Sequence, residues 1–192
     1  MLNASGVSLG KDWCAPHSVD TLPASVRCGL ALACALLTGI SAQVSVPLPF
    51  TPVPLTGQVF AVLFSGILLG AGFGSLSQIL YLAGGCAGIS WFSPVEGCVI
   101  RGTFGYLVGF IPAAALAGSA SRKTARPHVL LAACAGSIAV IHLCGVAWLA
   151  PWLGIGPAQA WAIGSLPFFP FDILKACLVI AVVCAIRGRC RQ

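Results

Sequence analysis

Four polar side chains in otherwise apolar surroundings are the residues best suited to chemistry in this sequence. Arg101 and Lys175 carry positive charge, Asp172 precedes Lys175 by three residues, and Tyr106 follows Arg101 by five residues. On a helix, residues three apart share a face, so Asp172 and Lys175 would lie about one turn apart. Tyr106 would be offset from Arg101 by roughly 140° around the axis and would flank the arginine side of a pocket.

The two cations and one anion leave a surplus of positive charge. A charged side chain inside a bilayer costs about 2.5 to 3.5 kcal/mol, so it normally faces a bundle interior and marks a functional site. A small ligand with a carboxylate would balance the surplus. The alternative is structural, with Asp172 pairing with Arg101 or Lys175 so that its helix can pack.

The composition places these residues in a membrane. The chain has 192 residues, of which 58% are hydrophobic and 7% are charged, against about 25% charged in soluble domains. Its mean hydropathy of +0.99 excludes a disordered chain, and its ten dispersed basic residues do not form a nucleic-acid-binding face. We therefore expect the lipid bilayer as its environment and no nucleic acid as a partner.

The apolar stretches predict the elements that position the polar residues. A span needs about 20 apolar residues, and such stretches cover residues 28–46, 56–87, 102–120, 128–148 and 168–186. The second contains a glycine cluster at 70–74, where one long helix could divide into two. Between the first two stretches, alternate prolines at 47–54 exclude a helix and predict a loop.

The basic residues decide how the second stretch is counted. Only with two helices between residues 56 and 87 do the basic clusters at 122–126 and 187–191 share the side of Arg27, as the positive-inside rule requires. We therefore predict an all-α integral membrane protein with six transmembrane helices and both termini cytoplasmic. Residues 1–25 would form a polar cytoplasmic segment, 26–187 a six-helix substrate-binding domain in the cell membrane, and 188–192 a basic tail.

Several other kinds of chemistry find no support in the sequence. It contains no phosphate-binding Gly-x-x-x-x-Gly-Lys motif, no Cys-x-x-Cys pair and only four acidic residues, so we expect neither an enzyme nor a metal or other cofactor. A solute-binding subunit that takes its energy from a partner fits better. Ala31 and Ala35 form a small-x-x-x-small pair on which another helix could dock, although packing within the bundle explains the pair equally well.

Three segments resemble one known family. They read VPLPFTPVPL at 46–55, RGTFGYLVGF at 101–110 and PFFPFDILK at 167–175. They are similar to the signature segments of BioY proteins, which are the biotin-specific S components of energy-coupling factor (ECF) transporters. The resemblance covers residues 27–186.

The resemblance implies a function and a set of site residues. It implies an outward-facing biotin pocket that includes Arg101, Tyr106, Asp172 and Lys175, with Ser90 near a position where some members place an amide. It also implies an energising module of a transmembrane T protein and two cytoplasmic ATPases, docked through Ala31 and Ala35.

Two other functions stay open at this point. One is an ion-coupled carrier that moves a small carboxylate vitamin by itself, with Asp172 as its proton site. The other is a structural membrane subunit that transports nothing. The sequence also leaves open whether the chain forms a homo-oligomer.

Overall fold

The structure is a computed structural model that describes residues 18–92 and 102–189. Its elements are the 3-10 helix η2 (Ser18–Thr21), helices α1 (Ala24–Gln43), α2 (Gln58–Cys86), α3 (Phe104–Lys123), α4 (Pro127–Leu153), α5 (Pro157–Gly164) and α6 (Phe169–Arg189), and strands β1 (Ser45–Val46) and β2 (Leu55–Thr56). Among the described residues, α1, α2, α3, α4 and α6 are long and apolar enough to cross a membrane. The predicted helical class is confirmed.

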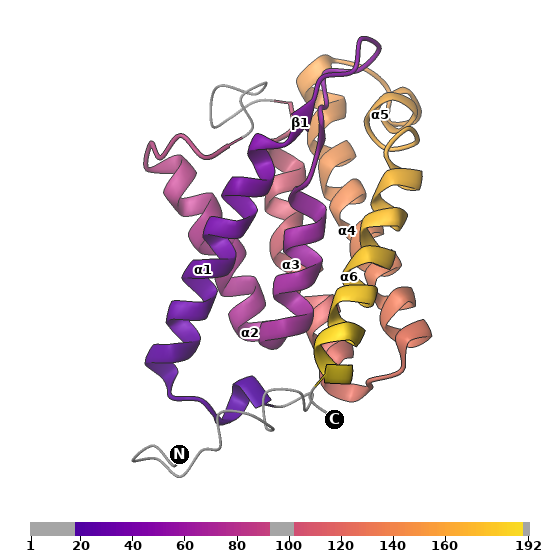
Figure 1. The fold of residues 1–192 in the computed structure, drawn as a ribbon. Helices are drawn as coiled ribbons and strands as arrows, with labels where there is room; N and C mark the ends of the chain where they lie inside the picture. Colours follow the sequence, from indigo (N-terminus) through magenta and orange to yellow (C-terminus); the bar gives the residue numbers. More distant parts are fainter. Residues whose placement is uncertain (1–17, 93–101, 190–192) are drawn as a thin grey trace.

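Helix α2 is a hairpin of two arms. Gly70 interrupts it with φ 79° and ψ 179°, a conformation that favours glycine because it lacks a Cβ. The side chains of Gln58 and Tyr81 form a 2.8 Å hydrogen bond although 23 residues separate them. Figure 1 shows α2 running down the bundle, turning and returning beside itself. The break predicted within the glycine cluster is therefore present, at Gly70.

Small and polar side chains hold the two arms together. A Cβ on Gly74 would lie only 2.8 Å from the Cα of Gly66, so glycine is what permits the close approach of the arms. Deeper in the bundle, the amide nitrogen of Gln78 lies 3.0 Å from Ser65 Oγ and 3.0 Å from Ser77 Oγ. These contacts satisfy a side chain that would otherwise be an unpaired polar group in an apolar interior.

Helix α1 packs against α2 through a stripe of small residues. Ala31 and Ala35 belong to this stripe, and both are completely buried within the bundle. Of the two explanations for the pair, internal packing is therefore the arrangement observed. A docking role for Ala31 and Ala35 remains a prediction, and it would require a change at this buried face.

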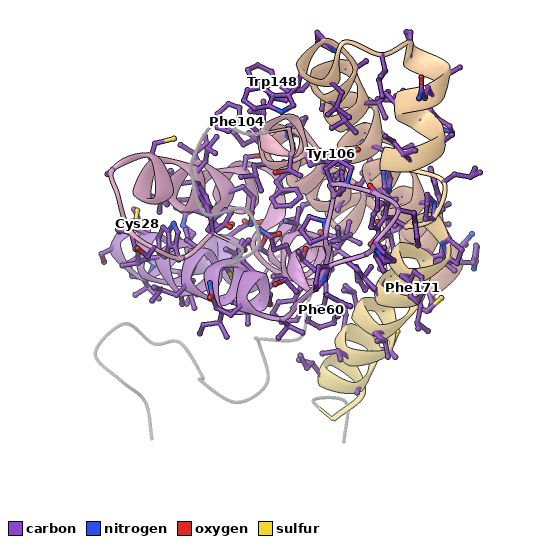
Figure 2. The ribbon with its side chains drawn as sticks, turned by 90° about the horizontal axis from the view of Figure 1, so that it is seen from above. Cys28, Phe60, Phe104, Tyr106, Trp148 and Phe171 are labelled. Atoms are coloured by element: carbon purple, nitrogen blue, oxygen red, sulfur yellow. The ribbon has the colours of Figure 1, made fainter. Side chains whose placement is uncertain are left out.

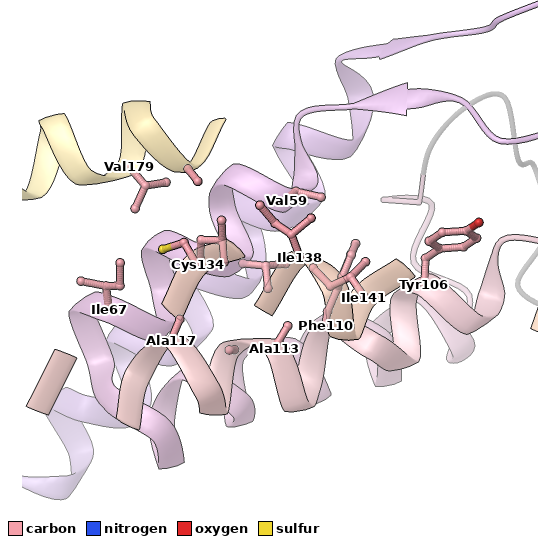
Figure 3. Close-up of a cluster of buried hydrophobic side chains, with 14 of the residues drawn as sticks. Val59, Ile67, Tyr106, Phe110, Ala113, Ala117, Cys134, Ile138, Ile141 and Val179 are labelled. Carbon is pink, nitrogen blue, oxygen red and sulfur yellow. The ribbon is translucent and has the colours of Figure 1, made fainter. Parts of the chain in front are cut away.

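The main hydrophobic core lies between α2, α3, α4 and α6. Figure 3 shows the side chains of Ile67, Phe110, Ile138 and Val179 converging there from these four helices. Close packing of α2 on α3 depends on Gly66, because a Cβ there would lie 2.5 Å from the carbonyl oxygen of Ala114. The core thus fixes the relative positions of the helices that carry the site at the end of the bundle drawn uppermost in Figure 1.

The connections at the upper end have more structure than the sequence predicts. The proline-rich segment is closed by a short antiparallel ribbon, with Ser45 opposite Thr56 and Val46 opposite Leu55. The stretch at 151–167, which lies between the last two predicted apolar stretches, contains the last turn of α4 and all of α5. Gly154 ends α4 with φ 66°, and Pro157 begins α5 at a position where its missing N–H is not needed. In Figure 1 the ribbon and α5 lie at the same end of the bundle.

Candidate functional site

A pocket opens at the end of the bundle that carries the ribbon and α5. Val53, Pro54 and Leu55 line it from the proline segment, and apolar side chains of α2, α3 and α4 line its inner wall. Its polar lining residues are Thr56, Gln58, Thr103, Tyr106, His142, Asp172 and Lys175. A mostly apolar cavity with a few convergent polar groups is the usual form of a small-molecule site.

Asp172 is the central charged group of this pocket. It lies in the first turn of α6, where the helix dipole favours a negative charge, and it is only 3% exposed. Its Oδ1 accepts a 2.7 Å hydrogen bond from Lys175 Nζ. Its Oδ2 lies 3.1 Å from His142 Nε2 on α4. The carboxylate is thus held by two helices, as a buried charge requires.

Tyr106 forms the wall of the pocket on the side of α3. Its hydroxyl donates a 2.7 Å hydrogen bond to the carbonyl oxygen of Gly164, at the end of α5. Gly145 on α4 makes room for the ring, because a Cβ there would overlap it. Figure 2 shows Tyr106 between the helices of the bundle, away from its outer surface. The hydroxyl therefore positions α5 relative to α3.

Three of the predicted site residues come together here. Tyr106, Asp172 and Lys175 all line the pocket, although 66 to 69 residues separate Tyr106 from the other two in the sequence. Arg101 lies outside the described residues. Ser90 is exposed and does not line this pocket, so its role in binding remains a prediction without support from the geometry.

The sequence reasoning missed two buried polar residues of the site. The sequence patterns predict neither His142 nor Gln58 as a site residue. Gln58 is 3% exposed and accepts a 2.9 Å hydrogen bond from Thr56. The signal in the sequence is that each is a polar residue within an apolar stretch, where such residues normally face the interior and serve a function.

The fold and the site together define a class of protein. The described residues include five apolar helices long enough to span a bilayer, and four of them (α2, α3, α4 and α6) line a pocket in which Lys175 and His142 contact a buried carboxylate. This arrangement is that of a multi-pass membrane protein with a partly polar pocket at one end of its helices.

Comparisons with known proteins identify the family. Residues 18–192 match the family model described as "BioY family". A protein of Pyrococcus horikoshii named "Probable biotin transporter BioY" is 36% identical over 155 residues, which cover 79% of this chain and 90% of that protein. The "Biotin transporter BioY" of Rhizobium etli is 30% identical over 171 residues, which cover 83% of this chain and 88% of that protein. The chain belongs to the BioY family.

A solved structure shares the fold. It is described as "Crystal structure at 2.1 A of the S-component for biotin from an ECF-type ABC transporter". The TM-score is 0.78 at 21% sequence identity, with 85% of this chain and 92% of that chain covered. The chain therefore shares its overall helical fold with that S-component.

Proposed function

We propose that this protein binds biotin in the pocket around Asp172 and delivers it into the cell together with an ATP-driven ECF module. The observation that carries the proposal is the buried Asp172 carboxylate, held between Lys175 and His142 in a chain whose relatives are named biotin transporters. An ionised carboxylate can only accept hydrogen bonds, and the ureido ring of biotin offers two N–H donors.

The two ends of biotin match two kinds of group in the proposed site. The ureido ring would bind at Asp172, since hydrogen bonds to a charged acceptor are the stronger kind. The valerate carboxylate would bind a cation, and Lys175 and Arg101 are the candidates. Apolar residues such as Leu107 and Phe110 would cover the thiophane ring and the chain.

Titration of the detergent-purified protein tests biotin capture. We expect saturable binding of biotin by calorimetry at submicromolar concentration. Lipoate is the matched control ligand, because it has a similar chain and carboxylate but no ureido group, and it should bind much more weakly. No binding of biotin at micromolar concentration would contradict the proposal, and equal binding of lipoate would remove Asp172 as the group that selects the ligand.

The topology proposed for this function has six spans. Each arm of the α2 hairpin would cross the membrane, with both termini cytoplasmic and the pocket end outside. Support comes from Arg27, Arg122, Lys123 and Arg126, which all lie near the end of the bundle away from the pocket, where α1 begins and α3 ends (Figure 1). A cysteine introduced at Ala125, in a background without other cysteines, should react with a membrane-impermeant reagent only after the cells are opened.

Coupling to the ECF module is tested separately. We expect biotin uptake into proteoliposomes to require the T protein, both ATPases and ATP. Uptake by this chain alone, driven by a proton gradient without ATP, would favour the ion-coupled carrier with Asp172 as its proton site. Normal uptake by a Lys175→Ala, Asp172→Ala double variant would favour a structural subunit.

A further inference from the structure

A histidine on α4 shares the buried carboxylate of the site. The side chain of His142 is 3% exposed and its Nε2 lies 3.1 Å from Asp172 Oδ2. The two residues are 30 positions apart in the sequence and come from different helices, so only the packing of α4 against α6 brings them together. His142 also lines the pocket.

The negative charge of the carboxylate decides which group donates in the hydrogen bond between His142 and Asp172. An ionised carboxylate has no hydrogen to give, so the proton between the two groups belongs to His142 Nε2, whatever the state of the other ring nitrogen. That nitrogen, Nδ1, is buried and has no hydrogen-bond partner among the described residues. Asp172 is therefore the polar group that holds the imidazole within the described part of the chain.

Two aromatic rings pack against the imidazole. The ring of Phe169 on α6 stacks on it, with centroids 4.6 Å apart and planes at 21°. The ring of Tyr106 on α3 meets it edge-on at 6.1 Å and 89°. The stacking on Phe169, together with the neighbouring Tyr106 ring, limits the freedom of the imidazole to turn, so its N–H is a well-placed donor for Asp172.

Lys175 is a less rigid donor to the same carboxylate. Its side chain is 16% exposed and reaches Asp172 through four methylene groups, whereas His142 has two rotatable bonds. With one donor on each oxygen, the plane of the carboxylate is determined. Without His142, the Asp172 carboxylate could rotate together with the movements of the flexible Lys175 side chain.

We propose that His142 is a positioning residue for ligand capture: it holds Asp172 Oδ2 so that the carboxylate presents its remaining lone pairs to N–H groups of the ligand. This inference rests on the proposed biotin function. It assigns to His142 an effect on affinity that acts through Asp172 and requires no direct contact between the imidazole and biotin.

Two variants of similar size distinguish the effect of the His142 N–H donor from the effect of the side chain's volume. His142→Gln keeps an N–H at about the distance of Nε2, and His142→Met has similar length but no donor. We expect His142→Met to weaken biotin binding by roughly ten-fold or more, the range for a hydrogen bond to a charged group, and His142→Gln to stay within about three-fold of wild type. His128→Met is the control, because His128 is exposed near the start of the same helix.

A double-mutant cycle tests whether the effect passes through Asp172. In an Asp172→Asn background, His142→Met should change biotin affinity by less than two-fold. Equal affinity of the Met and Gln variants would overturn the inference, and so would a full, additive loss in the Asp172→Asn background. Should His142→Met fail to fold in detergent, His142→Phe takes its place, since it keeps a ring stacked on Phe169.

The wild-type titration keeps the two proposals apart. Wild-type protein that binds no biotin would overturn the proposed function and this inference with it. Wild-type protein that binds biotin, beside a His142→Met protein that binds it equally well, would overturn the inference alone.

Discussion

Each end of the bundle holds an aspartate paired with a basic residue, but the two pairs lie in different surroundings. At the pocket end, the Asp172 side chain is 5% exposed and contacts both Lys175 and His142. At the opposite end, the Asp20 side chain is 43% exposed and lies 3.1 Å from Arg122 Nε. Burial requires that neighbouring groups match the charge of the first carboxylate, whereas water and salt screen the charge of the second.

The largest difference between the two ends should appear when each carboxylate becomes an amide. Asp172→Asn removes a charge-assisted acceptor and can present a donor toward the ureido N–H groups, so we expect a loss of roughly 1.5 to 3 kcal/mol in biotin binding. This corresponds to about a ten- to hundred-fold higher Kd by calorimetry. Asp20→Asn is the matched control and should bind normally. Wild-type affinity of a folded Asp172→Asn protein would remove the contrast between the two ends.

A second prediction concerns the close packing of α3 against the turn of the α2 hairpin, at the end away from the pocket. A Cβ on Gly118 of α3 would overlap the backbone of Gly70 and Ala71 at the hairpin turn, so Gly118→Ala should force α2 and α3 apart. We expect a loss of about 1 to 3 kcal/mol in stability, seen as a lower melting temperature in detergent. Gly72→Ala is the control, since a Cβ on Gly72 meets nothing within 4 Å. Biotin affinity of the folded Gly118→Ala protein should be unchanged; a large change would show that the two ends are coupled.

A smaller effect is expected at the wall of the pocket. Tyr106→Phe keeps the ring but leaves the carbonyl oxygen of Gly164 without its 2.7 Å donor. We expect a loss of about 0.5 to 1.5 kcal/mol in thermal stability, with a modest loss of affinity because α5 is less firmly placed. A loss of affinity as large as that of Asp172→Asn would indicate that the hydroxyl contacts the ligand directly.

The smallest effect should come from the partly exposed pair of Asp20 and Arg122 at the end away from the pocket. Arg122→Gln removes the charge opposite Asp20, and exposed ion pairs typically contribute about 0 to 1 kcal/mol. Melting temperatures at low and high salt should therefore differ little between this variant and the wild type, and biotin affinity should not change. A loss of more than 2 kcal/mol would place Arg122 among the residues on which the hairpin turn depends.

The parts of the fold that are encoded locally could be predicted from the sequence. A long apolar run, alternate prolines and a glycine cluster act within one segment, so the helices, the absence of a helix at 47–54 and the break at Gly70 follow from them. Tyr106, Asp172 and Lys175 could be selected because polar groups in apolar spans rarely lack a function.

The parts that depend on packing could not be predicted. The contact between His142 and Asp172 arises from how α4 meets α6, and no spacing in the sequence records it. The packing partner of Ala31 could not be predicted either, because a small residue permits close approach but does not determine which helix packs against it. Helix α5 has only 8 residues, too few for an apolar period to appear in a segment rich in glycine and proline.

The proline segment above the pocket also bears on the entropy of binding. Pro47, Pro49, Pro52 and Pro54 alternate with other residues, and each fixes its own φ and restricts the residue before it. The β1–β2 ribbon closes the two ends of the segment, so the free protein has few loop conformations to give up when a ligand enters. Ordering a flexible loop would reduce the affinity that the contacts provide. A stiff proline segment would reduce that loss before the proposed ligand binds, so its residues would contribute to affinity through the unbound state.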